Sequence, residues 1–238
     1  MPLFFMFRIN VYLSPLRNYG SIPFSYNQML AAGLYKRLSP IGQFEDRFAT
    51  SNLSFESNEV IQGRLHPKGN AKFTASFMTK HSYQEVYECL IEKELAIGDN
   101  VSMLQYLISD VQRQPPPVIS NVMRYGTASP IVVRKKQDNG NDLYLMPGER
   151  DFEDMFFEHA YYKFIGFTGS RVDVSKCTYK PEGKLNTKLI SIRKDNTTLQ
   201  VRGFVQPFTI TAPEEIQQTL IYAGAGDMNS LGFGCVEV

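Results

Sequence analysis

The chain has 238 residues, of which 43% are hydrophobic and 21% charged, a composition that is typical of a globular protein and excludes a mainly disordered one. Its length is sufficient for one large domain or two small ones. Lys and Arg together number 25 and Asp and Glu 24, so the formal net charge of +1 excludes an overall field that would attract nucleic acid or an acidic membrane. A charged binding surface must therefore be local.

The cysteines and the start of the chain indicate the compartment. Cys89, Cys177 and Cys235 are far apart and form no CxxC pair, which argues against a disulfide framework and against a thiolate zinc site. The apolar N-terminus has no basic region before it and is interrupted by Arg8, and no run approaches the roughly 18 apolar residues of a membrane span. We therefore predict a cytoplasmic protein that has no membrane partner.

Strand patterns and helix patterns alternate from the N-terminus onward. Aromatic and β-branched residues predict a strand over residues 5–13, and leucines at helical spacing predict a helix over residues 26–38. Ser25 and Gln28 resemble a capping box at the start of this helix. Further strands are predicted over residues 48–55, 60–65 and 71–78, the last two joined by a turn from His66 to Asn70.

A second helix is predicted after a second capping box, Ser82 with Glu85. Its apolar face would carry Val86, Cys89, Leu90 and Ile97, and residues 101–113 follow as an extended segment. The resulting order is strand, helix, strand, hairpin strand, helix, strand. This is the α+β arrangement of a ferredoxin-like (RRM-like) domain, in which two helices cover one face of an antiparallel sheet.

Pro115-Pro116-Pro117 can continue neither a helix nor a central strand, so we place a domain boundary there, between residues 1–114 and 118–238. A second ferredoxin-like unit is the simplest organisation of the remainder. Its predicted elements are an extended segment over 118–136, a helix over 151–164, strands over 172–179 and 185–205 with a turn at Lys194-Asp195-Asn196, a helix from the capping box Thr211 and Glu214 to Gly224, and a strand over 232–238.

The most distinctive motif is the segment GAGDMNSLGFG, residues 224–234, which has four glycines in eleven positions between a helix and the last strand. Glycine permits positive φ and a close approach of the backbone, so consecutive amides in such a segment can bind one phosphate. A helix cap followed by a β-bulge would show the same residues, and both interpretations stay open on this motif alone. The Walker and Rossmann patterns are absent.

Residues 222–238, YAGAGDMNSLGFGCVEV, resemble the C-terminal glycine-rich signature of the CRISPR-associated endoribonucleases that process repeat RNA. Two upstream stretches are also similar to that family: YGTASPIVV at residues 125–133, and Asp151-Phe152 followed by Lys163. The resemblance implies two tandem ferredoxin-like domains that bind CRISPR repeat RNA without a metal or other cofactor. The implied RNA contacts are Gly224, Gly226, Asn229, Ser230, Gly232 and Gly234, with Lys68 on the predicted basic hairpin.

The family's reaction is an attack of a ribose 2′-hydroxyl on the adjacent phosphodiester, which leaves a 2′,3′-cyclic phosphate and a 5′-hydroxyl. This reaction needs a base, an acid and positive charge near the phosphorane. The resemblance places Tyr35 at the family's tyrosine position and Arg47 near its lysine position, where it could only neutralise charge. The family's histidine after the first helix is missing from this sequence. We therefore predict an atypical site that uses Tyr35 with Arg47 or His66.

Each alternative for the missing histidine has an ordinary structural explanation. His66 lies in the basic stretch from Val60 to Lys80 and is otherwise an exposed turn residue, His81 precedes a helix, and His159 fits a helix core or interface. The functional alternative is a family member that holds repeat or guide RNA without cleaving it. The sequence also leaves open whether the chain forms a homodimer or joins a CRISPR effector complex.

One further stretch is locally basic. Between Arg171 and Arg202 there are eight Lys or Arg and three Asp or Glu, and no basic residue follows Arg202. This distribution fits a hairpin lying along an RNA backbone, and it also fits an ordinary solvated hairpin.

Overall fold

The first ferredoxin-like unit is built on strands whose alternate residues are apolar. A computed structural model describes residues 4–17, 20–41, 47–194 and 197–238, and only the backbone at 47 and 194. Phe7, Ile9, Val11 and Leu13 on the first strand are each at most 3% exposed and pack in one core with residues of the first two helices. The elements of this unit are β1 (Phe5–Pro15), β2 (Ile22–Pro23), α1 (Asn27–Leu38), η1 (Ser39–Ile41), β3 (Arg47–Thr50), β4 (Ser54–Ile61), β5 (Arg64–Thr79), α2 (Tyr83–Leu90), β6 (Glu94–Gly98) and β7 (Met103–Arg113).

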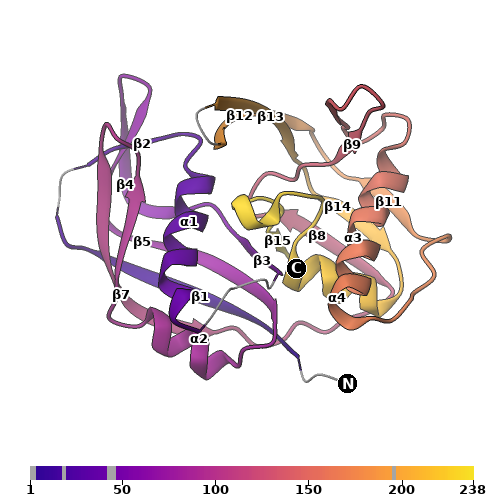
Figure 1. The fold of residues 1–238 in the computed structure, drawn as a ribbon, viewed down its shortest axis with the longest axis horizontal. Coiled ribbons are helices and arrows are strands. Elements are labelled where there is room, and N and C mark those ends of the chain that lie inside the picture. The colour runs from indigo at the N-terminus through magenta and orange to yellow at the C-terminus, as the bar shows by residue number, and fades with distance from the viewer. Residues whose placement is uncertain (1–3, 18–19, 42–46, 195–196) are drawn as a thin grey trace.

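The strand order identifies the topology. β1 lies between β5 and β7, and β3 pairs with β5, all antiparallel, so the four main strands follow the ferredoxin-like order. β4, β2 and β6 extend the sheet at its edges. Helices α1 and α2 lie together on one face of this sheet (Figure 1).

The second half repeats the same order. β8 lies between β14 and β15, and β11 pairs with β14, again all antiparallel. Two hairpins are inserted into this unit, β9–β10 before α3 and the long β12–β13 before β14. Its elements are β8 (Val122–Thr127), β9 (Arg134–Lys136), β10 (Asp142–Tyr144), α3 (Phe152–Thr168), β11 (Thr178–Pro181), β12 (Asn186–Lys194), β13 (Thr197–Val205), β14 (Phe208–Thr211), α4 (Glu214–Ala223), η2 (Asn229–Leu231) and β15 (Val236–Glu237).

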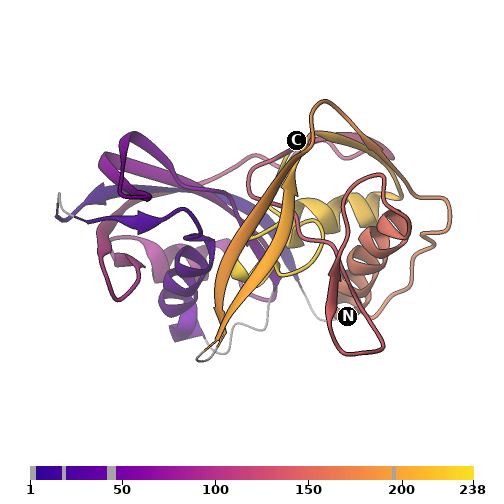
Figure 2. The same ribbon diagram turned by 90° about the horizontal axis from the view of Figure 1, so that it is seen from above.

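The two units pack against each other through α4 and the C-terminal segment. α4 contacts β5, β3 and β1, and Met78 of β5 belongs to the core of the second unit. The long β12–β13 hairpin leaves the second unit and reaches across to the first (Figure 2). Among the helices of the described residues, none is both long and apolar enough to cross a membrane.

The predicted turn from His66 to Asn70 is wrong. These residues continue the single long strand β5, and the chain reverses instead at Gln62 and Gly63, which both have positive φ. The strand accommodates these turn-forming residues through a register shift between Phe55 and Ser57 and a positive φ at Gly69. The Glu56 carboxylate accepts hydrogen bonds from Asn70 at the same place.

Of the three predicted capping boxes, only that of Ser82 and Glu85 forms. Tyr26 rather than Ser25 caps α1, without a side-chain hydrogen bond, because the Gln28 amide is engaged by the β12–β13 hairpin. At α4 the N-cap is Pro213, and Thr211 instead ends β14.

Several predicted boundaries also move. Ile97 lies in β6, not on α2, and β11 occupies only the end of the strand predicted over residues 172–179. The last strand is limited to Val236–Glu237 because the residues before it belong to the glycine-rich segment. β12 and β13 pair as predicted, whereas Asp195 and Asn196 of their predicted turn lie outside the described residues.

Candidate nucleic-acid interface

The glycine-rich loop, residues 224–234, runs from the end of α4 to the residues before β15 and lies between the two units. Gly224, Gly226, Gly232 and Gly234 are buried, and Asn229 is 8% exposed, whereas Ser230 is exposed. Its short helix η2 contacts both α1 and β3 of the first unit. The loop therefore joins the two units, and its exposed part is centred on Ser230.

Two of these positions show why glycine is needed. Gly226 and Gly232 have φ of +68° and +85°, a backbone conformation that residues with a Cβ rarely adopt. A Cβ at Gly232 would lie 2.5 Å from the Asn27 carbonyl oxygen of α1, and one at Gly226 would clash with the Val132 carbonyl oxygen. The close approach that requires glycine here is an approach of protein backbone to protein backbone.

The buried ammonium group of Lys163 holds the loop together from α3. It donates hydrogen bonds to the Gly224 carbonyl, to the Gly226 carbonyl at 2.8 Å and to Asn229 Oδ1 at 2.8 Å. The Asn229 amide in turn donates to the carbonyls of Ala225 and Phe233. Lys163 appeared in the sequence only as part of a family resemblance, and its spacing from the glycines gave no signal of this role.

Several loop amides also bond within the protein. The amides of Ala225, Gly232 and Gly234 donate to the carbonyls of Gly234, Asn229 and Pro130. From α1, the Asn27 side chain donates to the Gly232 carbonyl at 3.2 Å and to Asn52 Oδ1 at 2.9 Å. The backbone amides of Ala225, Gly232 and Gly234 are thus engaged in hydrogen bonds within the protein.

A charged cluster includes Asp227 of the loop. Asp227 accepts a hydrogen bond from Arg134, which also bonds Asp142 at 2.8 Å. Burial raises the pKa of Asp227, but the hydrogen bonds from Arg134 and from the Met228 amide outweigh it, and the pKa is lowered overall. His159 lies nearby on α3; burial lowers its pKa, and its Nδ1 is buried without a hydrogen-bond partner among the described residues.

Of the predicted catalytic residues, His66 lies apart from Tyr35 and from the backbone of Arg47. Tyr35 lies on α1 with its ring edge-on to Phe48 of β3, at a centroid distance of 4.7 Å. Arg47 precedes Phe48 in β3, which brings its backbone near Tyr35, and its side chain lies outside the described part of the chain. His66 is eleven residues before Phe77, the strand partner of Phe48, which corresponds to roughly 35 Å along β5.

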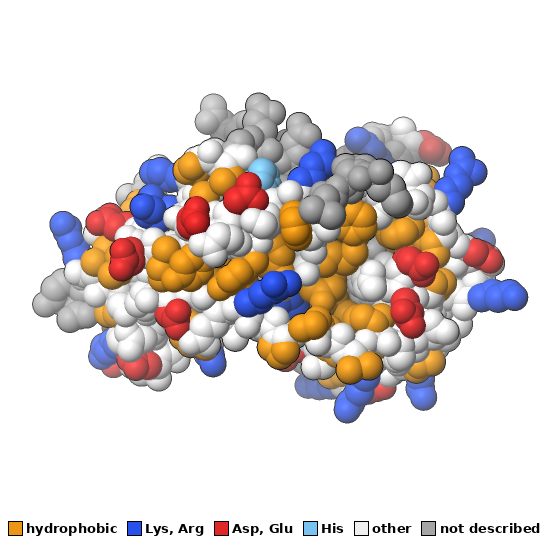
Figure 3. All heavy atoms as spheres, turned by 90° about the horizontal axis from the view of Figure 1, so that it is seen from below, with side chains coloured by type: hydrophobic (Ala, Val, Ile, Leu, Met, Phe, Trp, Pro, Cys, Tyr) orange, Lys and Arg blue, Asp and Glu red, His pale blue; other side chains and the backbone are white. Residues whose placement is uncertain are grey.

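Lys68 and the other two histidines occupy separate places. Lys68, predicted to contact RNA, forms an ion pair with Glu59 at 2.5 Å on the β4–β5 edge. His81 lies between β5 and α2, 3.8 Å from the Glu85 carboxylate, and His159 lies beside the glycine-rich loop. On the face seen in Figure 3, basic and acidic side chains are interspersed, and hydrophobic side chains gather towards the middle.

The basic β12–β13 hairpin contacts the helix that carries Tyr35. Gln28 of α1 donates to the Arg193 carbonyl at 2.5 Å and accepts from the Arg193 amide at 2.8 Å. Cross-strand pairs place Leu189 with Arg202 and Ser191 with Gln200 on the exposed face of the hairpin. The structure therefore brings the locally basic segment of the sequence next to α1.

Comparisons with known proteins agree with this architecture. Residues 114–238 match the family model described as "CRISPR associated protein Cas6, C-terminal". The chain is 26% identical to the putative CRISPR-associated endoribonuclease-like protein Cas6 of Pyrococcus furiosus and 25% identical to the Cas6nc protein of Pyrococcus horikoshii, over 97% of this chain and 98% and 99% of theirs.

Two solved structures show the same fold. One, a characterised Cas6-related gene product from Pyrococcus furiosus, has a TM-score of 0.84 at 22% identity and covers 98% of both chains. The other, described as a RAMP protein binding different RNA substrates, has a TM-score of 0.82 at 20% identity and covers 97% of this chain and 98% of its own. The tandem ferredoxin-like fold predicted from the sequence is confirmed, and the chain belongs to the Cas6 family of CRISPR-associated proteins.

Proposed function

We propose that this chain binds CRISPR repeat RNA and cleaves it at one phosphodiester by attack of the neighbouring 2′-hydroxyl, leaving 5′-hydroxyl and 2′,3′-cyclic phosphate ends. Family membership supports the substrate, because the relative from Pyrococcus furiosus is named as an endoribonuclease-like protein. Because the nucleophile belongs to the RNA itself, no metal-bound water is needed to supply one, and we propose that the reaction proceeds without a metal ion.

One observation supports the placement of the site. The short helix η2 of the glycine-rich loop contacts α1 and β3, the elements that carry Tyr35 and Arg47. RNA that passes the exposed Ser230 would therefore reach the surface formed by α1 and β3. The β12–β13 hairpin, bonded to α1 through Gln28, extends this surface with Arg193 and Arg202.

Within this proposal the side chains have distinct roles. The Tyr35 hydroxyl donates a proton to the 5′-oxygen as its bond to phosphorus breaks, the attacking 2′-hydroxyl gives its proton to water, and Arg47 neutralises the charge that develops on the phosphorane. The glycine-rich loop contributes contacts to the RNA backbone around the exposed Ser230, while Lys163, Asn229 and the buried glycines hold that loop in place. His66, which lies on a distant part of β5, would need RNA that extends that far.

A family member that binds repeat RNA without cleaving it is the second candidate. It is favoured by the absence of a histidine from the sequence between α1 and β3. It is also favoured by the distance along β5 from His66 to Phe77, the strand partner of the Phe48 that packs on Tyr35. Both candidates predict RNA binding, so the cleavage assay separates them.

The deciding experiment is a single-turnover assay on end-labelled repeat RNA in EDTA, with a 2′-deoxy substitution at the cut site. We expect discrete cleavage that the deoxy substitution abolishes, and a loss of about 10²-fold for Tyr35→Phe and for Arg47→Ala. Tyr162→Phe, at a tyrosine that is 59% exposed on α3, is the matched control and should cleave at the wild-type rate. Tight binding without cleavage would support the second candidate, and wild-type rates for Tyr35→Phe, Arg47→Ala and His66→Ala would refute the proposed residues.

A further inference from the structure

A cavity of about 650 Å³ opens between α1, the β6–β7 turn and the β12–β13 hairpin. It is separate from the Tyr35 ring, which packs against Phe48, and from the buried part of the glycine-rich loop. Both units contribute to it, because α1 and the turn belong to the first and the hairpin to the second. Its volume falls within the range of small-ligand sites.

The floor of the cavity is the outer side of α1. Met29, Ala32 and Lys36 follow one another at helical spacing and all line it. Ala32 is exposed, and its small side chain leaves the centre of this surface open. α1 also lies close to β6 at Gly33, where a Cβ would be only 2.9 Å from the Ala96 carbonyl oxygen.

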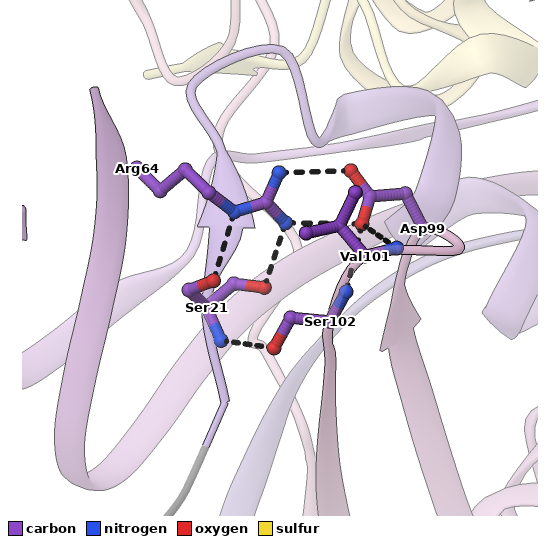
Figure 4. Close-up of polar contacts among 5 residues, drawn as sticks. All are labelled: Ser21, Arg64, Asp99, Val101 and Ser102. Atoms are coloured by element: carbon purple, nitrogen blue, oxygen red, sulfur yellow. Dashed lines mark hydrogen bonds and ion pairs between the residues drawn. The ribbon is translucent and has the colours of Figure 1, made fainter. Parts of the chain in front are cut away.

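The β6–β7 turn forms one wall, and Arg64 fixes its shape (Figure 4). The guanidinium group donates two 3.0 Å hydrogen bonds to the Asp99 carboxylate and further bonds to Ser21 Oγ at 2.8 Å and to the Ser21 carbonyl at 3.1 Å. Asp99 Oδ1 also accepts from the amides of Val101 and Ser102, both at 3.0 Å. The Arg64 hydrogen bonds lower the pKa of Asp99 to about 2, so its negative charge is held inside this network.

This hydrogen-bonded turn presents apolar side chains to solvent. Val101 is 78% exposed and Met103 is 46% exposed, and both line the cavity. Exposed apolar side chains grouped at one concave site are typical of a binding surface.

The β12–β13 hairpin forms the opposite wall. Ser191, Arg193 and Thr198 line it, and the two hydrogen bonds between Gln28 and the Arg193 backbone hold it against α1. The cavity thus combines apolar surface from Met29, Val101 and Met103 with the polar side chains of Asn100 and Thr198, and Lys36 and Arg193 add two positive charges.

We propose that this cavity takes one unpaired base of the bound RNA, an inference that rests on the proposed function. An apolar surface suits the face of a base, polar side chains suit its edge, and Lys36 and Arg193 suit the phosphates on either side. The only acidic side chain that lines the cavity within the described residues, Asp99, is engaged by Arg64 and two amides, so it does not oppose RNA.

The test combines a cavity-filling variant with RNA that lacks single bases. The affinity of the wild-type protein is measured for a series of repeat RNAs, each of which lacks one base. Loss of the base that enters the cavity should weaken binding about 10-fold, and loss of any other single base should weaken it less. Ala32→Trp, which fills the cavity, should bind intact repeat RNA about 10-fold more weakly and should no longer distinguish that abasic RNA from intact RNA. Gln84→Trp, at an exposed position on α2, is the control and should behave as wild type.

A second variant protects the test against a folding defect. Val101→Asp places a negative charge on an exposed side chain of the cavity wall and should weaken binding to a similar extent. Equal binding of intact repeat RNA by wild type, Ala32→Trp and Val101→Asp would overturn the base pocket and leave the proposed function standing. An equal loss relative to wild type for every RNA in Ala32→Trp, including the abasic RNA that wild type binds weakly, would also overturn it. Failure of the wild type to bind repeat RNA would refute the proposed function itself.

Discussion

The glycine-rich loop and the β6–β7 turn are each held by one basic side chain, yet in different ways. Lys163 is 6% exposed and binds three uncharged oxygens of the loop. The Arg64 side chain is 20% exposed and forms a two-point ion pair with Asp99. The loop joins two units of the protein, whereas the turn belongs to one.

The chemistry of each cation fits its task. An ammonium group directs three donors from a single point, which suits carbonyls that converge from a curled loop. A guanidinium group is a planar fork that matches a carboxylate and still reaches further acceptors, as Arg64 does with Ser21. Buried oxygens that lose their donor cost more than partly exposed ones, because water can replace the lost bonds at an exposed site, so the two anchors should differ in their contribution to stability.

The largest effect is expected for Lys163→Met. The substitution removes three hydrogen bonds and leaves buried carbonyl oxygens without a donor, so we expect a loss of about 3–5 kcal/mol in the free energy of unfolding. Urea unfolding followed by circular dichroism measures it. Lys176→Met, at an exposed lysine, should change stability by less than about 0.5 kcal/mol.

Arg64→Met makes the comparison direct. Because Arg64 is partly exposed, we expect a loss of about 1–2 kcal/mol, well below that of Lys163→Met. Equal losses for the two variants would show that burial of the charge does not distinguish these anchors.

A smaller effect is expected for Gly232→Ala measured against Gly140→Ala. Both glycines have positive φ, but a Cβ at Gly140 meets nothing within 4 Å, whereas one at Gly232 meets the Asn27 carbonyl. The backbone strain of a positive φ is common to both variants, so the difference between their free energies of unfolding measures the cost of the contact with Asn27. We expect this difference to be about 1–3 kcal/mol. Matching unfolding free energies would mean that α1 can move away from the loop.

The smallest effect is a pH dependence at His159, beside the loop. Burial lowers the pKa of His159 in the folded protein, and nearby Lys163 and Arg134 oppose its protonation while Asp227 and Glu158 favour it. The contribution of neutral His159 is therefore complete above the unfolded pKa of about 6.5, and it is lost as the pH falls below that value. We expect urea midpoints of wild type to fall more between pH 7.5 and 5.5 than those of His159→Gln; parallel curves would contradict this.

Much of the fold followed from local patterns. The apolar alternation in residues 5–13 and the reciprocal bonding of Ser82 and Glu85 depend only on neighbours in the chain, and both agree with the structure. Ser25 and Gln28 have the same spacing and similar residue types, but Gln28 bonds the Arg193 backbone 165 residues away in the chain. No pattern near Gln28 in the sequence predicts this partner. The site residues Tyr35 and Arg47 were named through family resemblance, and their role stays a prediction.

The sequence by itself determined the two α+β units and the glycine-rich segment, because strand alternation, helix spacing and clustered glycines are properties of short stretches. The family followed from the resemblance of that segment to a known signature. Tertiary structure alone decided that residues 66–70 continue a strand, that Lys163 fastens the glycine-rich loop, and that Arg64 shapes one wall of a cavity closed by a distant hairpin. Each of these depends on a partner far away in the chain. Such partners meet only when the two units pack, because a buried polar group bonds whichever acceptor the fold places beside it.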